Sequence, residues 1–146
     1  MPEIKNSRTE SNLRSAVSGE AQAMGLYMLF SERAKEEGFE ELAEIFREIA
    51  NNEKAHAEIY WKLLNSIGTT AENLCASKLI EEHECRVMYP EFASIAREEG
   101  LTDVAETLEK VGAIEEKHRE LFEKLENKMR TNGIFSGTSN SWICRN

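Results

Sequence analysis

Two motifs with the same chemistry occur in this 146-residue chain, Glu53-x-x-His56 and, sixty-two positions later, Glu115-x-x-His118. Residues three apart on a helix share a face, so each motif points a carboxylate and an imidazole in one direction. Apolar residues at helical spacing flank both motifs: Leu42, Ile45, Phe46 and Ile49 near the first, and Val104, Leu108, Val111, Phe122 and Leu125 near the second. A carboxylate on an apolar face is unfavourable unless it is paired or binds a metal.

Two more glutamates, Glu20 and Glu81, occupy core-type positions on the preceding helices. One glutamate from each of two helices, with Glu-x-x-His from the other two, is the ligand pattern of dimetal sites in helical bundles. Carboxylate and imidazole ligands without thiolate favour iron or manganese. The sequence therefore predicts a two-metal site in which bridging carboxylates hold both ions.

The alternative is that both Glu–His pairs lie on solvated helix surfaces and bind no metal, because the spacing Glu-x-x-His arises easily in a glutamate-rich helix. Against it, two of the three histidines carry the motif at matched positions, whereas His83 lies off the pattern and is expected at the surface or in packing. Cys85, like Cys75, is expected to be a small packing residue. Tyr27 and Tyr89 are either core aromatics or hydrogen-bond partners of a ligand carboxylate.

Four helices must position these residues, and the sequence predicts an all-α fold. Capping boxes at Ser7–Glu10 and Thr69–Glu72 open the first and third helices. Glycines end the first three helices: Gly38 the first, Gly68 the second (39–67) and Gly100 the third. The fourth helix is expected to run to about Arg130, and residues 131–146 are expected to form an irregular tail.

The segment Ala34–Gly38 returns as Ala96–Gly100, at the same offset as the histidine motifs. We therefore expect two homologous helical hairpins packed as one four-helix bundle over residues 1–130. At about 1.5 Å per residue, the four glutamates would reach one level of that bundle. Glu20 to Tyr27 is seven residues, whereas Glu81 to Tyr89 is eight, so a π-bulge is predicted between Glu81 and Tyr89.

Composition excludes several classes of function. The chain has 27 acidic and 18 basic residues, for a net charge of −9, which argues against nucleic acid or an anionic membrane as a partner. No apolar run approaches the roughly 20 residues of a membrane span. The N-terminus does not resemble a signal peptide, and the three cysteines form no C-x-x-C pair, so a cytoplasmic protein is expected.

The sequence resembles the rubrerythrin family over its whole length. The motifs that carry the resemblance are Gly19-Glu20, Glu53-x-x-His56, Glu81-x-x-Glu84, Met88-Tyr89-Pro90, Ala96–Gly100 and Glu115-x-x-His118. The resemblance implies a ferritin-like diiron domain with Glu53 and Glu115 bridging the irons, Glu20 and Glu81 terminal, and His118 on one iron. It also implies that the other iron exchanges His56 for Glu84 on oxidation. Manganese and zinc are alternative ions for these ligands.

The implied activity is NADH-linked reduction of hydrogen peroxide to water, a defence against oxidative stress. The residues expected to carry it are Glu20, Glu53, Glu84, Glu115, Tyr27 and Tyr89. Two rival interpretations stay open: a ferroxidase or iron-storage protein, and a structural bundle with a vestigial metal site.

Two features depart from the family. Rubrerythrins usually end in a rubredoxin domain with two C-x-x-C knuckles, whereas this chain stops at Trp142–Asn146 with Cys144 alone. A separate rubredoxin-like donor is therefore expected. In addition, Ile80 replaces a small residue and Cys85 replaces an aromatic one.

The connection between the second and third helices constrains the assembly. Residues 65–70 extend at most about 20 Å, too short to cross a ferritin-like bundle. Either the bundle is a simple up-down-up-down monomer, or each hairpin pairs with the other hairpin of a second chain. We expect the second arrangement, a domain-swapped homodimer.

Overall fold

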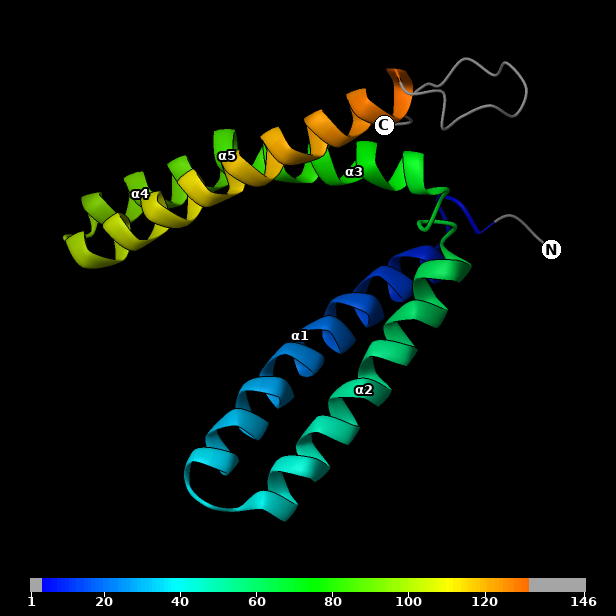
Figure 1. Ribbon diagram of the computed structural model, residues 1–146, viewed down its shortest axis with the longest axis vertical. Coiled ribbons are helices and arrows are strands. Elements are labelled where there is room, and N and C mark those ends of the chain that lie inside the picture. Colours follow the sequence, from blue (N-terminus) through cyan, green and yellow to red (C-terminus); the bar gives the residue numbers. More distant parts are fainter. Residues whose placement is uncertain (1–3, 132–146) are drawn as a thin grey trace. The chain divides into compact units, whose positions relative to one another are not determined.

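The structure, a computed structural model, describes residues 4–131, which are helical apart from short connections (Figure 1). The elements in order are α1 (Arg8–Glu36), α2 (Glu40–Leu63), α3 (Thr70–His83), the π-helix η1 (Glu84–Met88), α4 (Tyr89–Glu98) and α5 (Thr102–Thr131). The helices form two compact units that divide after Ile67. The all-α class and the two hairpins are as predicted, and the single domain over 1–130 stays a prediction.

The first unit is the hairpin of α1 and α2, which lie side by side in Figure 1. Ser7 caps α1 by accepting a hydrogen bond from the Glu10 N–H at 3.1 Å. The Glu10 carboxylate accepts from the N–H of Asn6 rather than from that of Ser7, so the expected capping box is displaced by one residue. The cap still satisfies N–H groups that would otherwise have no partner at the start of a helix.

The second unit pairs α5 with α3, η1 and α4, which follow one another along the chain without a break (Figure 1). The predicted capping box at its start is present. Thr69 accepts a hydrogen bond from the Glu72 N–H at 3.3 Å, and the Glu72 carboxylate accepts from the Thr69 N–H at 2.8 Å.

The turns of the two hairpins are built alike. Gly38 has φ 84° and Gly100 has φ 78°, a left-handed conformation that glycine adopts without strain. In the first turn the Phe39 N–H bonds to the Ala34 carbonyl at 2.8 Å, and in the second the Leu101 N–H bonds to the Ala96 carbonyl at 2.8 Å. Both are helix C-terminal motifs closed by glycine, so the sequence repeat is also a structural repeat.

The end of α2 differs from the prediction. The helix ends at Leu63, four residues before the expected Ile67, and Gly68 does not end it. Asn65 instead adopts φ 51°, and the Ser66 N–H bonds to the Trp61 carbonyl at 3.0 Å. Asparagine is one of the few residues besides glycine that tolerates this conformation. Residues 64–69 therefore form the link between the two units.

The predicted π-bulge is present as η1, at Glu84–Met88, where the Tyr89 N–H bonds to the Glu84 carbonyl five residues earlier. The extra residue between Glu81 and Tyr89 is thus absorbed inside a continuous helix rather than in a loop. The insertion lies in the segment that carries Glu81 and Glu84.

The buried residues at the helix seams are mostly small. They are Val17, Ala34, Ala43, Ala50 and Ala57 in the first hairpin, and Ala71, Cys75, Ala93, Ala96, Ala105 and Gly112 in the second. Several of the larger apolar residues expected on buried stripes are exposed, among them Leu42 at 50% and Val104 at 48%, whereas Phe46 and Leu108 are half-buried. A pair of helices buries only its seam, and the remaining apolar face needs another layer to cover it.

No helix among residues 4–131 combines the length and the apolar character of a membrane span. The predicted irregular tail lies outside the described residues except for Thr131, the last residue of α5.

Candidate metal centre

The first hairpin brings three predicted ligands together. Glu20 from α1 and Glu53 and His56 from α2 each offer one ligand atom, and these atoms lie within 4.8 Å of one another. Nδ1 of His56 is 2.9 Å from Oε2 of Glu53 and 3.8 Å from Oε2 of Glu20. Each carboxylate is half-buried, and the imidazole is exposed. One cation could contact all three side chains.

The second hairpin repeats this arrangement with Glu81 from α3 and Glu115 and His118 from α5, again within 4.8 Å. Nδ1 of His118 is 2.6 Å from Oε2 of Glu115 and 3.7 Å from Oε2 of Glu81. All six ligands predicted from spacing alone therefore fall into two groups of three. We call these the Glu20 group and the Glu81 group.

In each group, burial and a neighbouring carboxylate raise the pKa of one glutamate. The pKa of Glu20 is raised, first by a hydrogen bond with Glu53, then by burial and by the negative charge of Glu53. The pKa of Glu81 is raised by burial first, and then by the neighbouring carboxylate of Glu115. Two adjacent carboxylates disfavour double ionisation unless a proton or a cation lies between them. Each pair is therefore a natural position for a metal ion.

An observation on Glu81 supports a metal in particular. Its Oε2 is buried and has no hydrogen-bond partner among the described residues, although a buried carboxylate oxygen normally has one. Together the two groups supply four carboxylates and two imidazoles, a donor set that suits iron, manganese or zinc. The residues present fit a pair of such ions.

The remaining predicted site residues lie close to these groups in sequence. Glu84 is the first residue of η1 and half-buried, but it belongs to neither group. The pKa of Tyr89 is raised by burial and by the charges of Glu84, Glu115 and Glu81, so its phenol lies within the field of these acids. Tyr27 packs against Phe30 and Phe46, with ring centroids 6.2 and 6.3 Å away. This packing agrees with the alternative in which Tyr27 is a core aromatic residue. His83 is exposed, as expected.

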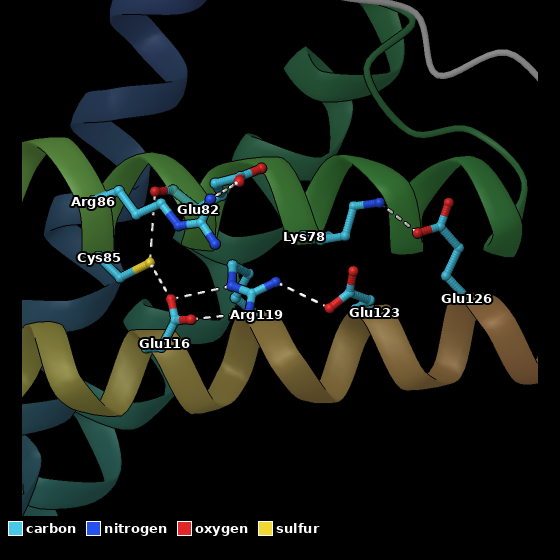
Figure 2. Close-up of polar contacts among 8 residues, drawn as sticks. All are labelled: Lys78, Glu82, Cys85, Arg86, Glu116, Arg119, Glu123 and Glu126. Atoms are coloured by element: carbon cyan, nitrogen blue, oxygen red, sulfur yellow. Dashed lines mark hydrogen bonds and ion pairs between the residues drawn. The ribbon is translucent and has the colours of Figure 1, made fainter.

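Sequence reasoning missed a polar network beside the Glu81 group (Figure 2). Cys85, expected to be a packing residue, directs its thiol at the carboxylate of Glu116, which Arg119 also contacts. No local spacing signals this contact, because Cys85 and Glu116 are 31 residues apart. Cys75 is buried, as expected for a packing residue, but it is also disulfide-bonded, which the packing prediction did not include.

Comparison with known proteins agrees with the geometry. The Rubrerythrin family model matches the chain twice, over residues 11–81 and 72–140. A rubrerythrin of Nitratidesulfovibrio vulgaris is 36% identical, covering 100% of this chain and 84% of its own length. A rubrerythrin of Porphyromonas gingivalis is 35% identical over 98% of this chain and 78% of its own. A putative rubrerythrin of Methanocaldococcus jannaschii is 34% identical, with coverage of 97% and 81%.

The two matches of one family model fall on the two hairpins, each of which carries one Glu–Glu–His group. These groups are consistent with a dinuclear metal site of the rubrerythrin type. The chain belongs to the rubrerythrin family and is a diiron protein with two Glu…Glu-x-x-His metal-binding groups.

Proposed function

We propose that this protein is a non-haem diiron peroxidase that reduces hydrogen peroxide to water. The observation that carries the proposal is the repeated Glu–Glu–His group, which supplies a matched ligand set from each hairpin. Two ferrous ions, when bound, supply the two electrons that convert one peroxide and two protons into two waters. Membership of a family whose relatives are named rubrerythrin supports the assignment.

The resemblance to rubrerythrins suggests the role of each ligand. Glu53 and Glu115 would be ligands shared by the two ions, and Glu20 and Glu81 would be terminal ligands. His118 would be a ligand of one ion, and His56 and Glu84 would be alternative ligands of the other. The four group carboxylates offset the charge of the ions. Tyr89, a phenol beside these acids, is suited to hold or pass a proton near the bound peroxide. Tyr27 is the corresponding candidate on α1.

Three ligands from one hairpin are too few for a closed iron site, so a complete centre requires both groups. We propose that they meet in a domain-swapped homodimer. Residues 64–69 span at most roughly 20 Å, whereas α2 at 24 residues is roughly 36 Å long. That link is too short to return along the bundle within one chain. The exposed apolar residues Leu42, Ile45 and Val104 favour a further helical layer.

Electrons are proposed to come from a separate rubredoxin-like donor. The link to NADH and the cytoplasmic location stay predictions.

Anaerobic iron loading followed by peroxide titration tests the function. We expect about two irons to bind for every two Glu–Glu–His groups. In stopped-flow experiments, one equivalent of peroxide should oxidise this iron far faster than dioxygen does. Faster oxidation by dioxygen, with growth of a mineral core, would favour the storage protein. Less than about one metal per chain would favour a structural bundle with a vestigial site.

A further inference from the structure

A polar network crosses the seam of the second hairpin beside the π-helix (Figure 2). Cys85 lies on η1, and its Sγ is 2.9 Å from Oε2 of Glu116 on α5. Arg119 holds the same carboxylate with two bonds, Nε to Oε2 at 3.1 Å and Nη2 to Oε1 at 2.9 Å. The Arg119 side chain is only 12% exposed. We call Cys85, Glu116 and Arg119 the Cys85 brace.

The donors and acceptors of the Cys85 brace can be assigned from the chemistry of its side chains. A thiol has one proton, and the charged oxygen of Glu116 is a better acceptor for it than the Glu82 carbonyl, which lies 3.6 Å from Sγ. Arg119 donates two bonds to the Glu116 carboxylate, and both are charge-assisted. The other end of Arg119 contacts Glu123 at 3.1 Å, which fixes the guanidinium on α5. Glu116 is therefore contacted by both Cys85 and Arg119, and Arg119 is held by a second carboxylate, that of Glu123.

The first hairpin does not repeat the brace. Sixty-two positions before Glu116 and Arg119 stand Lys54 and Ala57, and Ala57 is buried in the seam. Neither side chain can make the bonds that Glu116 and Arg119 make. The brace occurs in the hairpin that carries the π-helix and the extra acid Glu84.

Each end of the brace adjoins a candidate ligand in the chain. Cys85 follows Glu84 on η1, and Glu116 follows Glu115 on α5. A π-turn is rare and marginal, and slipping to an α-turn would swing its side chains around the helix axis. A bond from Cys85 to the neighbouring helix opposes that slip.

We propose that the Cys85 brace is a positioning device that holds η1 against α5 and so sets where the Glu84 carboxylate stands relative to the Glu81 group. This inference rests on the proposed diiron function. It assigns a role to Cys85 in the second hairpin.

The same hairpin offers a matched control. Lys78 on α3 and Glu126 on α5 form another bond across the seam, with Nζ 2.6 Å from Oε2, and both side chains are largely buried (Figure 2). Lys78→Met removes a bond between helices without touching the brace. It reports what a general loss of hairpin stability does to metal binding.

The test is titration of the full-length, metal-free protein with Co²⁺, whose visible absorption reports its oxygen and nitrogen ligands. In Cys85→Ala and Glu116→Gln, we expect one of the two ions to bind roughly 10- to 100-fold more weakly, with a changed spectrum. Cys85→Ser keeps a donor and should restore wild-type binding. Lys78→Met should lower the melting temperature while leaving Co²⁺ affinity and spectrum unchanged.

Two results would overturn the brace alone: two Co²⁺ ions bound normally by Cys85→Ala and Glu116→Gln, or an equal loss of affinity in Lys78→Met. Failure of the wild-type protein to bind Co²⁺ would instead overturn the proposed diiron function, and the brace with it. Melting curves of every variant establish that each is folded before titration.

Discussion

Nδ1 of His118 lies 2.6 Å from Oε2 of Glu115, one helical turn earlier on α5. His56 and Glu53 have the same relationship on α2, at 2.9 Å. The spacing of three residues on a regular helix is sufficient to produce both contacts. The third ligand, a second carboxylate, then comes from the adjacent helix, so each hairpin presents a preformed ligand group.

Loss of one imidazole should remove metal without unfolding the protein. We expect His118→Ala to bind about half of the wild-type iron or less, because the remaining acids of the Glu81 group cannot complete the coordination of an ion. Metal analysis after anaerobic loading measures this. His83→Ala is the matched control, since His83 is exposed and outside both groups, and it should load fully. Full iron content in His118→Ala would contradict the assignment.

The acids that bind metal should destabilise the metal-free protein at neutral pH. The pKa of Glu81 is raised above its ordinary value of 4.5, so the folded state takes up this proton more readily than the unfolded state. Its favourable contribution is complete below 4.5 and is lost as pH rises through the folded pKa. Metal-free Glu81→Gln should therefore melt a few degrees higher than wild type at about pH 7.

That gain should shrink as the pH is lowered through the raised pKa of Glu81 toward its ordinary value of 4.5, because the wild-type carboxyl group then takes up a proton in the folded state. Scanning calorimetry of both proteins across this range measures the difference. Glu98→Gln removes an exposed acid at the end of α4 and serves as the control for the loss of one negative charge. A constant difference at every pH would argue against a shared proton between Glu81 and Glu115.

The two hairpin turns should respond alike to loss of glycine. Gly38→Ala and Gly100→Ala each place a side chain at positive φ, and each should lower the free energy of unfolding by about 1 kcal/mol. Gly25→Ala, in an exposed part of α1 with nothing within 4 Å of an added Cβ, should instead be neutral or stabilise by up to about 1 kcal/mol. Urea denaturation of the metal-free proteins distinguishes them. Equal effects at all three positions would show that φ does not govern the cost.

The swapped assembly depends on the length of residues 64–69. Light scattering should give a dimeric mass for the wild-type protein. Insertion of about 20 glycine and serine residues into this link should permit monomers that still bind two irons, because a longer link can run back along the bundle. An insertion of about three residues is too short and should leave the dimer intact. A wild-type monomer with both irons bound would exclude the swap.

Local spacing in the sequence was enough to predict the ligand groups, the two glycine turns and the π-helix at Glu84–Met88. These features depend on hydrogen bonds and side-chain contacts between residues close in the chain, or on a repeat offset that the sequence displays. The end of α2 is also local, but it was predicted wrongly. The sequence pattern predicts that Gly68 ends the helix, whereas Asn65 adopts the left-handed conformation.

The tertiary structure alone revealed the contact between Cys85 and Glu116, the nearly buried Arg119 and the exposure of Leu42 and Val104. Helical periodicity identifies which residues share a face but not which neighbouring helix covers it. A bond between residues 31 positions apart depends on how two helices align across their seam. That alignment follows from packing of the small residues in the seam, whose types do not specify what lies opposite them.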